Sequence, residues 1–323
     1  ISDGWSNEII LKELTEAYQS FIDNVSFRPK QPSIQFKDFA AWQNQKINSA
    51  DGIEADIFWK QVLEKPIENL AFPFDYKRPT IKTYNGDIFS ILIGKEISVQ
   101  FADLCKTQNV SLYHGLLAIY RILLFRYSGQ KDFIVGTALA GRENKELEGI
   151  VGNFVNTIPL RFEIEDNLTF EKFISQVKTG FLKAFDHSFY PLDKIIAASN
   201  IDVSRSHSPL FDFGFTWQNT ESKGWDQFKL AFGAEMLPLS NAHKSAKYDL
   251  WLLGAEKQAG IEIAFEFNTD LFKRDSIQLF AERFKNVIAE VCKNPSVIIS
   301  QIKLDNKEFK ESITDTASFE FEF

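Results

Sequence analysis

The sequence predicts an α/β protein in which helices pack on a mixed β-sheet, and three patterns support this fold class. Apolar residues alternate with small or polar ones in FDFGFTWQN (211–219) and GIEIAFEFN (260–268), which predicts two β-strands. The continuous apolar run DFIVGTALA (132–140) is typical of a buried strand. Between 169 and 187 the apolar residues form one stripe at helical spacing. Strands and helices mixed in this way indicate a layered sandwich.

The chain before residue 66 is expected to be helical. Helical spacing predicts a helix over 6–21, a second that starts at Asp38, whose side chain can cap it, and a third over 55–63. Prolines then interrupt the pattern between 66 and 85. We therefore expect an irregular segment there that crosses from one lobe to the other.

After this segment, strands and helices follow one another. Strands are expected at 87–93, 132–140, 155–162, 211–219, 260–268 and 297–302, with helices at 111–127, 169–187 and 275–293. A loop is expected over 141–153. The length of 323 residues suits two lobes of roughly 150 residues each.

Composition argues against several classes of partner. The net charge is −8 and no run of Lys or Arg supplies a basic face, so a nucleic-acid partner is not expected. No apolar stretch approaches the roughly 20 residues that a membrane span needs. Cys105 and Cys292 both lie in apolar helical patterns and are expected to be buried hydrophobic residues in a reducing compartment. We therefore expect a cytoplasmic protein.

Common catalytic and metal-binding signatures are absent from the sequence, including a phosphate-binding glycine loop, a cysteine pair at metal spacing and a nucleophile elbow. His114 lies in an apolar helix and is expected to be a core or capping residue. His187 is expected to have a structural role at a helix end, where the helix dipole favours a cation. His207 and His243 lie in polar loops and are expected to be solvated. Residue chemistry by itself leaves the activity open.

Several ordered motifs together resemble a known family. They are DFAAW (38–42), FWKQVL (58–63), PFDYKRP (73–79), RYSGQKDFIVGTALAGR (126–142), IVGNFVNTIPLR (150–161) and HSPLF (207–211). In content and order they are similar to the condensation domain of nonribosomal peptide synthetases, which belongs to the chloramphenicol-acetyltransferase-like acyltransferases. The resemblance extends to about residue 310.

This resemblance implies a two-layer sandwich made of one complete lobe and part of another. Residues 1–65 would form the end of the N-terminal lobe, residues 66–85 the crossing segment and residues 86–310 the C-terminal lobe. Residues 311–323 would be a tail or linker.

The opening residues ISDG resemble the end of the family's His-His-X-X-X-Asp-Gly motif. Asp3 and Gly4 would be its acid and its glycine, and both histidines would lie before Ile1. The second histidine is thought to position or deprotonate the attacking amine, so the chain as printed is expected to be inactive. The resemblance implies an ion pair between Asp3 and Arg142. The alternative is that Asp3 only caps the helix that follows it.

The implied reaction joins two carrier-tethered substrates through an amide bond. Phosphopantetheine arms of upstream and downstream peptidyl carrier domains would deliver the thioesters, beside an adjacent adenylation domain, and neither a metal nor a directly bound cofactor is expected. The residues implied near the channel floor are Gly152, Asn153, Asn156 and Thr157. The alternative is that GNFVNT (152–157) is only a tight turn that leads into a strand.

Two other functions share this fold. One is a noncatalytic relative that serves as a docking platform for carrier domains or a tailoring enzyme. The other is a free-standing acyltransferase that uses a soluble substrate.

Overall fold

The computed structural model describes residues 2–29, 31–66, 68–165, 167–199, 204–218 and 244–304. Six strands of this part of the chain form one sheet in the order β1-β6-β5-β4-β2-β3. The strands are β1 (Gly86–Gly94), β2 (Ile134–Leu139), β3 (Asn156–Arg161), β4 (Phe213–Gln218), β5 (Leu250–Lys257) and β6 (Gly260–Asn268). Strand β4 runs parallel to β2 and β5, whereas the other pairs are antiparallel. The mixed sheet predicted from the sequence is confirmed.

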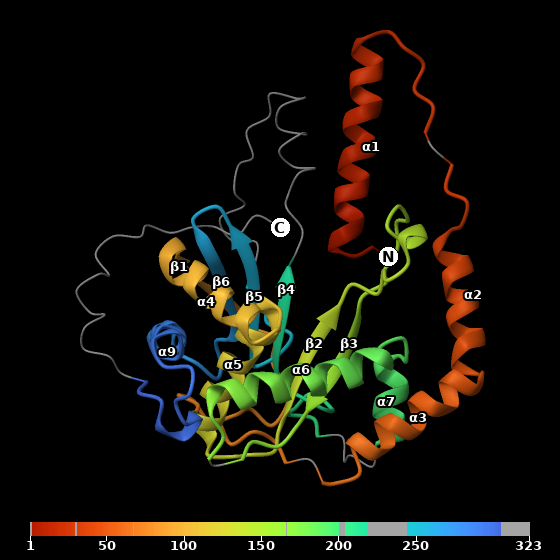
Figure 1. The fold of residues 1–323 in the computed structure, drawn as a ribbon. Coiled ribbons are helices and arrows are strands. Elements are labelled where there is room, and N and C mark those ends of the chain that lie inside the picture. Colours follow the sequence, from red (N-terminus) through yellow and green to blue (C-terminus); the bar gives the residue numbers. More distant parts are fainter. Residues whose placement is uncertain are drawn as a thin grey trace.

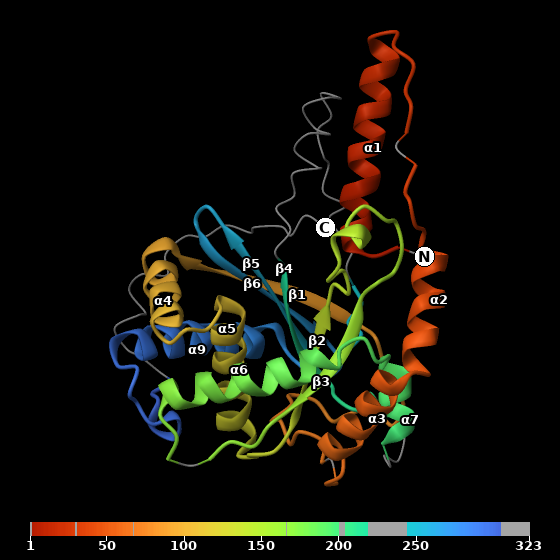
Figure 2. The same ribbon diagram turned by 45° about the vertical axis from the view of Figure 1, so that its right-hand side comes forward.

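Four helices form the second layer, on one face of the sheet (Figures 1 and 2). They are α4 (Lys95–Thr107), α5 (Leu112–Ser128), α6 (Phe170–Asp186) and α9 (Arg274–Lys293). Helix α5 is buried on all sides from His114 to Phe125, which explains its almost continuous apolar sequence. The core between the layers is rich in fully buried aromatic rings, including Phe173, Phe215, Phe265, Phe280 and Phe284.

The other α-helices of the described residues lie beyond the β3 edge of the sheet (Figure 1). They are α1 (Gly4–Ile22), α2 (Phe36–Ile47), α3 (Ala50–Val62) and α7 (Leu192–Ala198). Figures 1 and 2 show α1 projecting away from the sheet. Its apolar stripe predicted a helix correctly, but Ile10, Leu14 and Phe21 on that stripe are exposed.

An irregular segment from 68 to 85 leads from α3 to β1, as the prolines predicted. Two buried ion pairs attach it to the sheet. The guanidinium of Arg78 contacts the carboxylate of Asp249, and Lys82 Nζ lies 3.1 Å from Asp212 Oδ1. Asp212 directly precedes β4 and Asp249 directly precedes β5. The two ion pairs therefore hold the segment at the end of the sheet where these strands begin.

Several predictions about secondary structure need correction, and one is the helix expected at 55–63, which is α3 and begins at Ala50. The strand expected at 297–302 is a single bridge from Ile298 to Thr169, followed by a 3₁₀ turn, η2 (Ile299–Gln301). A 3₁₀ turn repeats every three residues, and it therefore turns both Ile299 and Ile302 into the core.

Strand β5 and helix α7 were not predicted. Helix α2 begins at Phe36 rather than Asp38, whose carboxylate accepts the backbone N–H of Gln35 at 2.8 Å from within the first turn.

Other predictions fall partly outside the described residues. His243, the end of the strand expected at 211–219 and the tail 311–323 are among the undescribed positions. Cys105 and Cys292 are free thiols, and burial raises the pKa of Cys105 to about 12. In the described part of the chain, no helix is both long and apolar enough to cross a bilayer.

Candidate functional site

The loop between β2 and β3 lies beside the start of α1 (Figure 1). It leaves β2 through Gly141, whose φ of +66° is a left-handed conformation that favours glycine. A Cβ at this position would lie 2.1 Å from the carbonyl oxygen of Phe154. Gly141 therefore lets the two arms of the loop approach each other, and it directs the next side chain, Arg142, inward.

Arg142 is the centre of this loop. Its side chain is only 1% exposed, and Nη1 donates to the carbonyl oxygens of Leu147 and Ile150, at 2.6 Å each. Nη2 donates to both carboxylate oxygens of Asp3, at 3.0 and 3.2 Å. The guanidinium also lies over the ring of Phe154, 4.1 Å from its centroid. The buried positive charge is thus balanced by a carboxylate from the beginning of the chain.

Asp3 has two roles in the structure, corresponding to both alternatives raised from the sequence. It caps α1 by accepting the backbone N–H of Ser6 at 2.9 Å, and it pairs with Arg142. It also accepts the N–H of Phe154 at 3.1 Å. Burial by itself would raise the pKa of Asp3. The hydrogen bonds from Ser6 and Phe154, and the charge of Arg142, together lower this pKa below its ordinary value.

Ser6 completes the arrangement and was missed by sequence reasoning. Its fully buried hydroxyl lies 2.7 Å from Asp3 Oδ1 and 2.9 Å from the carbonyl oxygen of Gly152. It accepts hydrogen bonds from Arg142 Nη2 and from the N–H of Gly152, both at 3.0 Å. The available signal was the spacing, because a serine three residues after an N-cap can return its hydroxyl to that cap. We call Asp3, Ser6, Arg142 and Gly152 the hub.

Gly152 is required here for close packing. Its φ is not positive, but a Cβ would lie 2.3 Å from the ring of Phe36 in α2. Phe36 and its neighbour Phe39 also pack on Phe154, with ring centroids 5.0 and 4.7 Å away. Trp5 binds the outer side of the loop, donating Nε1–H to the carbonyl of Glu148 at 2.9 Å. The loop is therefore enclosed between α1 and α2.

The other residues named from the sequence are distributed differently. Asn156 donates its amide to the carbonyl oxygens of Ser188 and Tyr190, at 2.7 and 2.8 Å, so it clamps the turn before α7. Asn153 is exposed, and Thr157 is half-buried opposite Ala138. The structure brings Gly152 into the hub and places Asn156, Asn153 and Thr157 outside it.

Gly4 opens α1 beside the hub. A Cβ there would meet no described atom within 4 Å. Many contacts thus fix the side chain of Asp3, whereas the described residues leave room for a side chain at position 4.

A family model described as "Condensation domain" matches residues 1–314. The chain belongs to this family. The resemblance noted from its motifs is confirmed.

This condensation domain is similar to segments of very large synthases. It is 36% identical over 316 residues to Gramicidin S synthase 2 of Brevibacillus brevis, covering 97% of the chain and 7% of that relative. It is 32% identical over 313 residues to Tyrocidine synthase 3 of Brevibacillus parabrevis, covering 97% of the chain and 5% of that relative. The chain therefore spans less than a tenth of the length of either relative.

Solved structures share its fold. A four-domain nonribosomal peptide synthetase, holo-AB3403 bound to AMP and glycine, matches with a TM-score of 0.79 and 22% identity, over 96% of this chain and 24% of that one. The X-domain from teicoplanin biosynthesis matches with a TM-score of 0.82 and 22% identity, over 94% of this chain and 69% of that one. The two-layer α/β sandwich predicted from the sequence is thereby confirmed.

Two histidines of the condensation domain have contacts that fit structural roles. His114 caps α5 through Ser111, with Oγ 2.7 Å from Nδ1, and its Nε2 is buried with no partner among the described residues. Burial, followed by the charge of Lys178, lowers the pKa of His114 to about 4. His187 ends α6 and stacks on Phe58 with a centroid distance of 4.2 Å.

The prediction that His207 is solvated is wrong. Its Nδ1 lies 2.6 Å from Asp212 Oδ2, and its side chain is 18% exposed. The turn in HSPLF folds back so that the amide of Ser208 also binds Asp212, at 2.8 Å. Burial would raise the pKa of Asp212, but the hydrogen bond from His207 and the charge of Lys82 help to lower it to about 2.

The hub can position neighbouring residues, but each of its own polar side chains is already hydrogen-bonded. The carboxylate of Asp3, the guanidinium of Arg142 and the hydroxyl of Ser6 all bind one another. Within the described residues, no group of three or more His, Cys, Asp or Glu side chains could hold a metal ion. The arrangement fixes Asp3 and the first turn of α1 against the β2–β3 loop.

Proposed function

We propose that this condensation domain forms an amide bond between two carrier-tethered substrates. The α-amine of an aminoacyl thioester would attack the carbonyl of a peptidyl or aminoacyl thioester, and the thiol of the donor's phosphopantetheine arm would leave. The observation that carries the proposal is the hub. It fixes Asp3 and Gly4, which match the end of the family's His-His-X-X-X-Asp-Gly motif, against the loop that carries Gly152.

The hub's role in this reaction would be positional. A catalytic histidine must be held within hydrogen-bond reach of the attacking amine, and small misplacements are costly. The motif places its second histidine only four residues before its acid. Fixing Asp3 would therefore restrict the positions that this histidine can reach. Ion pairing to Arg142 keeps that restriction in place at neutral pH.

The proposed partners are an upstream and a downstream peptidyl carrier domain, with an adenylation domain adjacent in the same synthetase. We further propose that residues 1–65 end the N-terminal lobe, that 66–85 form the crossing segment, and that the C-terminal lobe runs from 86 to 310. Support comes from the irregular path of the segment and its two ion pairs to the sheet.

A condensation assay tests this function. The chain as printed and a chain extended upstream through the His-His pair would be incubated with aminoacyl-loaded donor and acceptor carrier domains, and the product detected by mass spectrometry. We expect product only from the extended chain. Changing the second histidine of the extended chain to alanine should abolish it, because the amine would lose its positioning group. Equal yields from the printed and extended chains would contradict the proposed location of the histidines.

A second candidate is a noncatalytic docking platform. The observation in its favour is that the fold matches the X-domain as well as it matches the four-domain synthetase, and one solved structure is a complex of the X-domain with OxyB. Residues upstream of Asp3 distinguish the two functions. Binding of carrier domains by the extended chain, without any amide product, would support the platform and reject the enzyme.

A further inference from the structure

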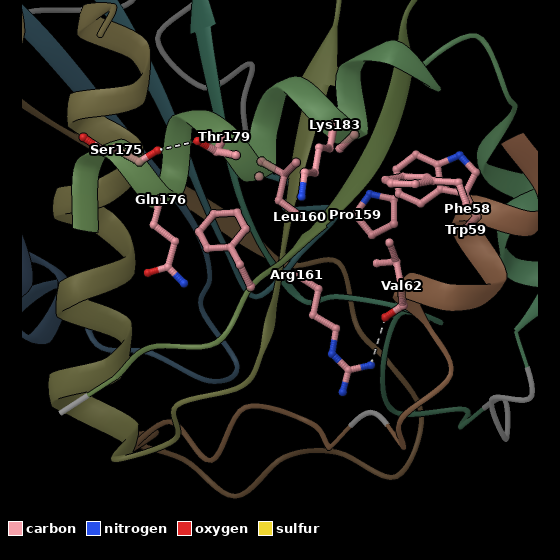
Figure 3. A pocket seen from close by; sticks show the side chains of 13 residues that line it. Phe58, Trp59, Val62, Pro159, Leu160, Arg161, Ser175, Gln176, Thr179 and Lys183 are labelled. Atoms are coloured by element: carbon pink, nitrogen blue, oxygen red, sulfur yellow. Dashed lines mark hydrogen bonds between the residues drawn. The ribbon is translucent and has the colours of Figure 1, made fainter. Parts of the chain in front are cut away.

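A cavity of about 470 Å³ lies between α3, the end of β3 and α6 (Figure 3). It is separate from the hub, since β3 begins beside the loop at Asn156 and reaches the cavity only at Pro159. Its volume is in the range of small-molecule sites, which are typically a few hundred Å³. Helices from two distant parts of the chain form its two sides.

One side of the cavity is apolar and already fixed in place. Phe58, Trp59 and Val62 line it from α3. Trp59 is fully buried and donates Nε1–H to the carbonyl of His187 at 3.3 Å, while Phe58 stacks on the His187 ring. Leu160 closes the floor from β3. These contacts hold the aromatic wall in one position, so a ligand would meet a preformed surface.

The uncharged polar side chains that line the cavity from α6 are already engaged. Ser175 Oγ donates to the carbonyl of Glu171 at 3.1 Å, and Thr179 Oγ1 donates to that of Ser175 at 3.0 Å. Gln176 Nε2 donates to the carbonyl of Glu163 at 2.9 Å. Each of these three groups already donates one hydrogen bond within the protein.

Of the two cations at the cavity, one is engaged and one is not. Arg161 binds Asp132 at 2.6 Å and three backbone carbonyls, of which the one of Lys65 is 2.9 Å away. Lys183, an exposed residue of α6, reaches toward Pro159 and Leu160 (Figure 3), and its ammonium has no acceptor among the described residues. The cavity therefore combines apolar walls with one uncommitted positive charge.

We propose that this cavity binds a small apolar monocarboxylate: an aromatic or aliphatic body within the walls and one carboxylate on Lys183. An ammonium is a compact charge that pairs well with a single carboxylate. A phosphate dianion is disfavoured, because Arg161 is already engaged and the single ammonium of Lys183 balances only one of its two negative charges. The inference does not depend on amide-bond formation.

Binding of 4-phenylbutyrate and of its neutral amide, 4-phenylbutanamide, tests the site by calorimetry and tryptophan fluorescence. We expect the acid to bind the printed chain more tightly than the amide. Lys183→Gln should weaken binding of the acid by about tenfold and leave binding of the amide unchanged, because only the acid pairs with the charge of Lys183. Lys172→Gln is the matched control, since Lys172 is exposed on the same helix but does not line the cavity.

A second variant tests the location. Thr179→Trp would fill the cavity from an exposed position on α6, so it should abolish binding of both the acid and the amide without lowering the melting temperature. The proposal is overturned if the acid shows no saturable binding at millimolar concentration. It is equally overturned if Lys183→Gln and Lys172→Gln have the same effect. None of these outcomes bears on the condensation assay.

Discussion

Two buried arginines in this domain solve the same electrostatic problem in different ways. Arg142 in the hub faces the carboxylate of Asp3. Arg121 in α5 is fully buried and forms no ion pair within the described residues. It donates instead to backbone carbonyls at the ends of β2 and β3, including those of Leu160 at 3.1 Å and Phe162 at 2.7 Å, and lies over the ring of Phe162. Burial lowers the pKa of Arg121 to about 9, against the opposing effect of the charge of Asp132.

The difference follows from what each side chain connects. Arg121 joins a helix to two strands that already pair with each other, so carbonyl dipoles and an aromatic face are enough. Arg142 joins segments that are 139 residues apart and do not pair as strands, and a full countercharge makes that junction specific. We infer that α5 stabilises the lobe as a whole, whereas the hub fixes the local position of α1.

The largest effect that would test this comparison is expected from Arg121→Ala. The change leaves several buried carbonyls without a donor and opens a cavity, so the free energy of unfolding should fall by about 4 kcal/mol. Urea denaturation followed by circular dichroism would measure it. Arg121→Lys retains the charge and should cost less. A loss below about 1 kcal/mol for the alanine variant would show that Arg121 does not stabilise the lobe.

A somewhat smaller loss of stability is expected at low pH, where His114 in the first turn of α5 becomes protonated. The folded-state pKa of about 4 lies below the ordinary value of 6.5, so between these pH values the unfolded chain binds more protons than the folded one. The contribution of His114 to stability should therefore be constant above pH 6.5 and fall by at most about 3 kcal/mol as the pH drops toward 4.

Denaturation of wild type and His114→Gln across this pH range would test that slope. Glutamine at this position can still complete the capping box with Ser111, so the variant should fold and should lose the slope. Asp3, whose pKa is lowered, loses its contribution only below pH 3.8, as the pH falls through its folded value. An unaltered slope in the variant would assign the acid sensitivity to another group.

The smallest effect is expected from Asp3→Asn, because it should remain local. Loss of the countercharge should open the hub at a cost of about 2 kcal/mol, and amide exchange should accelerate at Gly152 and Phe154 but not in α5. Asp23→Asn, at the exposed end of α1, is the control. Equal acceleration in α5 would mean that hub and lobe unfold as one unit, which would remove the distinction between the two arginines.

Much of the fold was predictable because most elements have one buried face. Alternation located β6, and helical spacing located α6 and α9. β5 was missed because it is a central strand with LWLLGA along it, so burial on both faces removes the alternation that identifies a strand. The error at 297–302 has a similar cause, since a short apolar segment at the sheet's end fits a 3₁₀ turn as well as a strand.

The candidate site was predictable only in part. The pairing of Asp3 with Arg142 came from motif resemblance, and no local pattern relates residues so far apart. Ser6 was overlooked because a serine inside a helix commonly has no tertiary partner. The motif resemblance gave Asn156 a place near a channel floor, and it did not indicate that the amide of Asn156 donates to the turn before α7. Long-range hydrogen bonds of this kind depend on the assembled fold, which periodicity does not encode.

The close fit of Gly152 against Phe36 limits how this domain could be recombined with its relatives. A crossover placed anywhere between α2 and the loop would combine a Phe36 from one parent with position 152 from the other. Any side chain at that position would overlap the ring, because even a Cβ lies 2.3 Å from it. The same crossover would separate Asp3 from Arg142. A chimera that inherits the whole stretch from Asp3 to Gly152 from this domain keeps both contacts.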